Sequence, residues 1–186
     1  MKKTILFILL AITLSCKAQQ IYPLRTFTEI PENSYEKDTH NEFQYYEGIW
    51  KGTWDNKTIF ITLKKVTNKY DNVYKYYRDY LIGKFKVLDL NGQVLFDNTN
   101  LSDNNAKIKG IGFRKIDDKY SFIYIDPDLC AMNGSGRFNF TDSNKTKLEW
   151  RYFEDENWID TDCFYYGLPA NQRPKPLPNN IVLTKQ

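Results

Sequence analysis

Histidine, cysteine and alanine are scarce in this sequence. Its 186 residues contain one His and three Cys, and only four Ala occur from Cys16 onward. A single His excludes the His-based metal sites and catalytic triads, because these need several imidazoles or an imidazole placed beside a nucleophile. We expect His40 to be an exposed side chain. The shortage of Ala, the best helix former, argues against a helical domain.

A strong excess of one charge is missing as well. Lys and Arg number 26 against 23 Asp and Glu, which leaves a net charge of +3. A nucleic-acid-binding protein would show a clear basic excess, so no nucleic-acid partner is expected. The apolar runs are also shorter than the roughly 20 residues that a membrane-spanning helix requires.

Residues 1–18 have the pattern of a signal peptide, because two lysines precede an apolar run that ends at Leu14. The sequence Leu14-Ser15-Cys16 resembles a bacterial lipobox, in which the Cys is acylated and becomes the mature N-terminus. The alternative is simple cleavage after Ala18. We therefore expect an exported protein of the periplasm or outer membrane, anchored by lipid at Cys16, or else a secreted one.

Cys130 and Cys163 remain as an even pair once Cys16 is set aside. Exported proteins fold in oxidising compartments, where paired cysteines form disulfides. The sequence therefore predicts a Cys130–Cys163 disulfide. The alternative is two buried free thiols.

Residues 19–47 are polar and contain Pro23 and Pro31. The stretch 17–47 holds six acidic residues and three basic ones. This composition favours an extended chain over a packed one. We expect residues 19–47 to be a tether that holds the following domain away from the membrane.

From Gly48 onward the sequence is typical of β-structure. Apolar and polar residues alternate with a period of two in several runs, for example around Ile59, Ile61 and Leu63. Turn-forming pairs separate these runs, and Asn91-Gly92 is the strongest hairpin signal. Residues 48–186 therefore predict one all-β domain of about eight to ten antiparallel strands, closed as an up-and-down barrel. The alternative is a two-sheet β-sandwich.

Four prolines lie in residues 167–178, just before an apolar run at Ile181–Leu183. We expect this stretch to be a stiff crossover to a closing strand, because proline-rich chain is extended and cannot pair in a sheet. The alternative is a peptide that docks a partner.

Gly48-Ile49-Trp50, followed by Trp54, resembles the Gly-x-Trp opening of lipocalin-like barrels, in which the Trp closes one end. This resemblance implies structural roles for Gly48, Trp50 and Trp54. The stretch Asn33–Gly52 and the C-terminal Tyr165–Pro169 and Leu177–Leu183 are similar to a family of short exported proteins and lipoproteins of Gram-negative bacteria. That family implies a cell-envelope location and a barrel, and it implies no activity.

Two Asp-x-Asp pairs, Asp126/Asp128 and Asp160/Asp162, lie just before the two cysteines of the predicted disulfide. A disulfide would bring four carboxylates near one another, and carboxylate oxygens are the ligands that Ca²⁺ prefers. Paired carboxylates are also the machinery of glycoside hydrolysis. The plainer interpretation is solvated aspartates in turns, with no cofactor.

Aromatic residues are abundant: 14 Tyr, 12 Phe and 4 Trp. Dense clusters place Tyr76, Tyr77 and Tyr80 in one segment and Tyr165 and Tyr166 in another. A tyrosine combines an apolar face with a polar tip, which suits sugars and amphipathic ligands. These five tyrosines are the predicted ligand-binding residues, although rings of this kind also fill cores and cover strand edges.

These features favour a non-enzymatic envelope protein that binds a small amphipathic ligand or a partner, or that serves a structural role. A glycan- or protein-binding module with surface aromatics is the first alternative. A glycan-acting enzyme with paired aspartates is the second. An open apolar cup inside the barrel would favour the binding of a small amphipathic ligand. A filled barrel with rings on its outside would favour the glycan- or protein-binding module.

Overall fold

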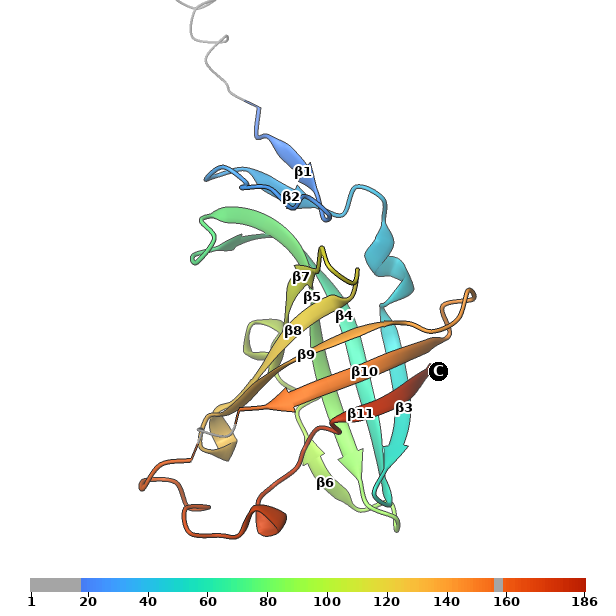
Figure 1. Cartoon of the computed structure of the whole chain (residues 1–186), viewed down its shortest axis with the longest axis vertical. Helices are drawn as coiled ribbons and strands as arrows, with labels where there is room; N and C mark the ends of the chain where they lie inside the picture. Colours follow the sequence, from blue (N-terminus) through green and yellow to red (C-terminus); the bar gives the residue numbers. More distant parts are fainter. Residues whose placement is uncertain (1–17, 156–158) are drawn as a thin grey trace, which may run out of the picture.

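The computed structural model describes residues 18–155 and 159–186 and shows an all-β protein with a closed antiparallel barrel of eight strands (Figure 1). The barrel strands are β3 (Gly48–Trp54), β4 (Lys57–Asp71), β5 (Tyr76–Leu88), β7 (Ile108–Phe113), β8 (Tyr120–Asp126), β9 (Met132–Phe140), β10 (Lys147–Glu154) and β11 (Asn180–Lys185). They pair in chain order, and β11 closes onto β3 with Thr184 opposite Lys51. This confirms the up-and-down barrel rather than the sandwich.

Three further strands lie outside the barrel: β1 (Ile21–Pro23), β2 (Tyr35–Lys37) and β6 (Val94–Asp97). β6 forms the predicted Asn91-Gly92 hairpin with the end of β5. The helices are four short 3₁₀ turns: η1 (Glu42–Tyr45), η2 (Asp103–Asn105), η3 (Pro127–Leu129) and η4 (Ala170–Gln172). No helix in the described ranges is long and apolar enough to cross a membrane.

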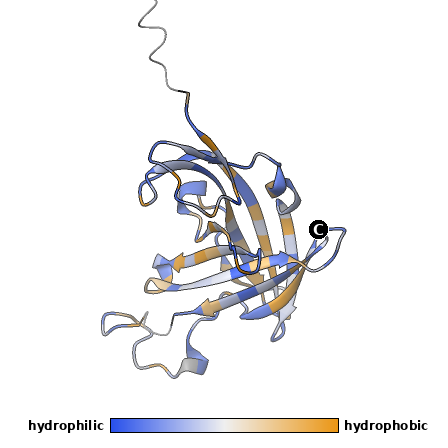
Figure 2. Ribbon diagram, turned by 45° about the horizontal axis from the view of Figure 1, so that its top comes forward, coloured by the Kyte–Doolittle hydropathy of each residue, from blue (hydrophilic) through white to orange (hydrophobic). Residues whose placement is uncertain are grey.

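The alternation read from the sequence sets the inner and outer faces of the strands. Ile59, Ile61 and Leu63 of β4 are buried, and the residues between them are partly exposed. Apolar and polar bands alternate along the strands in Figure 2. Because successive strand residues point to opposite faces, each strand contributes every second side chain to the barrel interior.

Aromatic rings occupy much of that interior. Trp50 and Trp150 are fully buried, and the ring of Trp150 stacks on Phe122 at a centroid distance of 4.3 Å. A Cβ atom at Gly136 would collide with the Phe122 ring, so this glycine makes room for it. Much of the aromatic excess of the sequence is therefore core packing, which adds edge and stacking contacts to area burial.

The residues of the Gly-x-Trp motif lie at the start of β3 and contribute Trp50 to the core. Gly48 begins β3 with φ +121°, a conformation that favours glycine. The indole N–H of Trp50 donates to the Tyr46 carbonyl at 2.7 Å, which satisfies its buried polar atom. Trp54 ends β3 and is half-buried against the core.

The segment 19–47 differs from the expected polar tether, because it packs against the barrel. β1 pairs with β2, and β2 pairs in parallel with β5; both lie above the barrel beside the end of the β4–β5 hairpin (Figure 1). Phe43 is fully buried within the aromatic core. The polar residues that suggested a solvated chain are instead hydrogen-bonded, and Ser34, Glu36 and Asp38 are buried.

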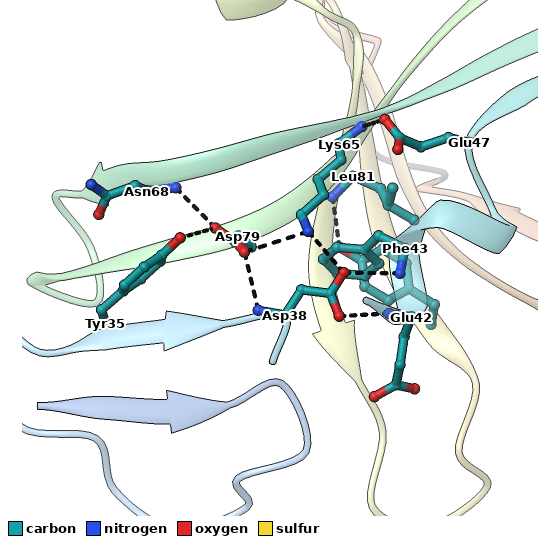
Figure 3. A network of polar contacts seen from close by, with 10 residues as sticks. Tyr35, Asp38, Glu42, Phe43, Glu47, Lys65, Asn68, Asp79 and Leu81 are labelled. Atoms are coloured by element: carbon teal, nitrogen blue, oxygen red, sulfur yellow. Dashed lines mark hydrogen bonds and ion pairs between the residues drawn. The ribbon is translucent and has the colours of Figure 1, made fainter. Parts of the chain in front are cut away.

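A buried polar network fastens this segment to β4 and β5 (Figure 3). The Asp79 carboxylate accepts hydrogen bonds from the Tyr35 hydroxyl at 2.6 Å and from the backbone N–H groups of Asn68 and Asp38. The Lys65 ammonium lies 2.9 Å from one Asp38 oxygen and 3.8 Å from Asp79. Each buried charge therefore has partners, which buried charges require.

The predicted disulfide is present between Cys130 and Cys163, whose Cα atoms lie 5.5 Å apart. It ties the turn after β8 to the long connection between β10 and β11. The proline-rich part of that connection leads into β11, and the Pro178 carbonyl accepts from the Trp150 indole at 3.1 Å. The connection thus serves as the predicted crossover.

We expect the protein, when it folds under oxidising conditions, to carry this disulfide quantitatively, because the two cysteines already lie at bonding geometry in the fold. Unfolding the protein in a thiol-alkylating reagent without reductant should label neither Cys130 nor Cys163, and both should react after reduction. Labelling of both residues before reduction would contradict the expectation.

Candidate binding cleft

β5 and β7 close the barrel through only a short pairing, with Ile82 opposite Lys109 and Gly83 opposite Ile108. Beyond this point β5 leaves β7 and pairs with β2 instead, so that Arg78 lies opposite Glu36. The wall of the barrel therefore divides here. The Arg78 guanidinium spans the division by donating to the Ile111 carbonyl of β7.

Arg78 is the buried cation of this region, with 3% of its surface exposed. Its Nε lies 3.5 Å from the Glu36 carboxylate, and its Nη1 lies 3.7 Å from Asp71. The guanidinium carbon is 5.0 Å from the ring centre of Tyr74 and 5.8 Å from that of Tyr80. These cation–π contacts hold the two rings in place around Arg78.

Burial raises the pKa of Glu36 to about 7, although Arg78 pulls it down. Burial also raises the pKa of Tyr80, although Arg78 again acts to lower it. The Tyr80 hydroxyl is therefore neutral at pH 7 and both donates and accepts hydrogen bonds.

A cleft of about 480 Å³ opens beside Arg78, between the β4–β5 hairpin and the outer faces of β7 and β8. We call it the hairpin cleft. Its rings and cations are Tyr70, Tyr74, Tyr80, Lys69, Arg78 and Lys109. Lys69 and Lys109 are exposed and form no ion pair with any residue that the structure describes. The hairpin cleft thus combines aromatic faces with unneutralised positive charge.

A second cleft, of about 380 Å³, follows the outer faces of β7 and β8 toward η3. We call it the β7–β8 cleft. Asn104, Lys109 and Ile123 line both clefts. Lys107 lines this one, and its ammonium lies 2.5 Å from Asp126 and 2.7 Å from Asp128. Burial lowers the pKa of the Lys107 ammonium, but the two carboxylates raise it by more, so the pKa lies above its ordinary value.

The four aspartates do not form the predicted calcium site. Lys107 occupies the position between Asp126 and Asp128 that a cation would take, and the Tyr124 hydroxyl donates to Asp126. Asp160 and Asp162 are exposed, and Asp160 accepts the Asp162 N–H in a local turn. Within residues 18–155 and 159–186 there is no group of three or more His, Cys, Asp or Glu that could hold a metal ion.

The predicted tyrosines separate into two places. Tyr80 lines the hairpin cleft, and Tyr76 and Tyr77 support it by packing on Tyr74 and Tyr70. Tyr165 and Tyr166 lie on the connection near the disulfide instead. Sequence reasoning missed Tyr70, at the end of β4, and Tyr74, in the turn between β4 and β5.

Two other predicted residues lie outside the cleft. His40 is exposed in the segment between β2 and η1. Cys16, the predicted lipid anchor, lies outside the described residues.

Comparison with curated proteins and with solved structures gives no match. The family comparison gives a match over residues 1–186 to the Family of unknown function (DUF6705). A match over the full length shows membership, and the chain therefore belongs to the DUF6705 family of unknown function.

Proposed function

We propose that this protein is a non-enzymatic, exported module that binds glycan in the hairpin cleft. The observation that carries the proposal is the set of tyrosine rings around Arg78, flanked by two unpaired lysines. Sugars bind proteins by stacking their apolar faces on aromatic rings while their hydroxyls bond to neighbouring polar groups. The signal-peptide pattern of residues 1–18 and the lipobox-like position of Cys16 support a cell-envelope location, with the protein held by lipid at the outer membrane or in the periplasm.

The filled interior supports an outside site over a ligand cup inside the barrel. Tyr120, Phe122, Phe138 and Trp150 are buried there and contact one another ring to ring. An amphipathic ligand would have to displace these rings, whereas the hairpin cleft is already open. The ion pairs of Lys107 with Asp126 and Asp128 weigh against a pair of catalytic acids there.

A screen of acidic and neutral oligosaccharides with the purified protein tests this proposal. We expect Tyr74→Ala to weaken binding of the best ligand by about fivefold, the effect of losing one aromatic face of roughly 1 kcal/mol. Tyr74 is exposed on the hairpin, so the variant should fold normally.

Tyr166→Ala is the matched control, because Tyr166 is also exposed but lies on the connection near the disulfide. It should leave the affinity unchanged. Equal losses in both variants, or no saccharide binding at all, would contradict a site in the hairpin cleft.

A further inference from the structure

The hairpin cleft and the β7–β8 cleft are neighbours with common walls. Asn104, Lys109 and Ile123 line both of them. The first reaches back to the β4–β5 turn at Asn72, and the second reaches forward to Asp128 in η3. Together they form one groove across the outer face of β7 and β8. A groove that runs from the β4–β5 turn to η3 suits an extended ligand better than a compact one.

The groove carries local positive charge. Its two carboxylates are already engaged, Asp71 with Arg78 and Asp128 with Lys107. Lys69 lies at one end and Lys109 at the junction of the two clefts, and neither forms an ion pair with the described residues. An acidic ligand would therefore gain attraction at both places without breaking an existing pair.

Exposed amide side chains complete the wall. Asn72 lines the hairpin cleft, Asn105 lines the β7–β8 cleft, and Asn104 lies between them. An amide donates and accepts at once, which matches the hydroxyl groups of a sugar. A nucleic-acid strand is the competing polyanion, and the amide-lined wall, which matches sugar hydroxyls, favours the saccharide.

We propose that the two clefts act as one groove that binds an extended acidic oligosaccharide, with Lys109 at its centre contacting a carboxylate of the chain. This inference rests on the proposed glycan-binding function and adds the ligand's charge and length. Tyr74 and Tyr80 would stack on sugar rings at one end. The β7–β8 cleft would hold the following units.

The test uses oligogalacturonates of increasing length and their methyl-esterified forms, titrated calorimetrically into the full protein. We expect affinity to rise with length until the chain covers both clefts and then to level off. Esterification removes the carboxylates and should weaken binding. Lys109→Gln should weaken binding of the acidic octamer by about two- to fivefold, the effect of losing one exposed ion pair.

Ile125 gives a matched pair of variants in the β7–β8 cleft, because 48% of its surface is exposed and substitution should not disturb folding. Ile125→Glu should weaken binding of the octamer and leave that of the dimer unchanged. Ile125→Lys, at the same position with opposite charge, should strengthen octamer binding.

Three results would overturn the inference. If octamer and dimer bind equally and Ile125→Glu has no effect, while Tyr74→Ala still weakens binding, the hairpin cleft acts alone and only the proposed function survives. If a single-stranded oligonucleotide binds more tightly than the octamer, the glycan assignment is wrong. If Tyr74→Ala changes no saccharide binding, the proposed function itself fails.

Discussion

Replacing Asp79 by Ala should lower the free energy of unfolding by about 3–5 kcal/mol, the usual loss when one partner of a buried ionic group is removed. Only 2% of Asp79 is exposed, and its carboxylate accepts from Tyr35, Asn68 and Asp38. Ala would leave the buried Asp38 N–H and the partly buried donors of Tyr35 and Asn68 without this acceptor, and an unsatisfied buried donor costs more than a hydrogen bond is worth. Urea denaturation followed by tryptophan fluorescence measures the loss.

Asp142→Ala is the matched control for this variant. Asp142 also accepts from two backbone N–H groups, those of Thr146 and Lys147, but it lies on an exposed turn between β9 and β10. Water replaces its hydrogen bonds in the variant, so we expect a much smaller loss than in Asp79→Ala. Equal losses for the two variants would show that burial does not determine how much Asp79 contributes to the free energy of unfolding.

Hydrogen exchange separates a local effect from a global one. Asp79 joins β2 and the start of η1 to β4 and β5 (Figure 3). In Asp79→Ala the amides of Asp38 and Phe43 should exchange faster than those of β9 and β10, because the N-terminal segment loses its main attachment. Uniform acceleration throughout the barrel would mean that the network supports the whole fold.

The barrel could be predicted from the sequence because the patterns that indicate strands and turns are local. Alternation in runs such as Ile59–Leu63 identifies a face, and Asn91-Gly92 identifies a turn, without knowledge of distant residues. A turn-forming residue does not always end a strand, and Asn68 is the example. β4 continues to Asp71, and Asn68, with φ 51°, lies where its register with β5 shifts. The left-handed preference of Asn serves a bulge as well as a turn.

The N-terminal segment and the cleft depend on pairings that no local pattern reveals. Asp38 and Glu36 have the composition of a solvated tether, yet Lys65 and Arg78, distant in sequence, bring them into the protein. Asp126 and Asp128 likewise suggested a calcium site by their residue type, but Lys107, which directly precedes β7, occupies the position of the cation. Residue type alone suggested what these groups could bind. Their actual partners depend on which strands pair and in which register, and the sequence pattern does not reveal that.

Glu36 should make the protein less stable as the pH rises. It is 8% exposed, and the charged groups that act on it are Arg78, which favours its ionised form, and Asp79, which opposes it. Burial outweighs Arg78 and raises the pKa of Glu36 from 4.5 to about 7 in the folded protein. Between these values the unfolded chain has lost the Glu36 proton while the folded protein keeps it.

Folding therefore takes up a proton between about pH 4.5 and pH 7, so the contribution of Glu36 to stability is complete below this window and lost above it. The expected loss is roughly 3 kcal/mol, from the size of the pKa shift. Urea denaturation at a series of pH values, in wild type and in Glu36→Gln, isolates this group. Because Gln does not titrate, the variant should gain stability relative to wild type as the pH rises to 7 and keep a constant difference above that.

Glu149→Gln provides a control of opposite sign. Hydrogen bonds from Lys119 and Arg151 lower the pKa of Glu149, so its contribution is present at neutral pH and is lost as the pH falls below the ordinary range of a glutamate. Relative to wild type, this variant should lose stability at neutral pH and recover it in acid. The contrary outcome is a difference in the free energy of unfolding between wild type and Glu36→Gln that stays constant from pH 4 to 8, while Glu149→Gln behaves as expected. In that case Glu36 is ionised in the folded protein, and the Arg78 cation beneath the hairpin cleft is already paired with it.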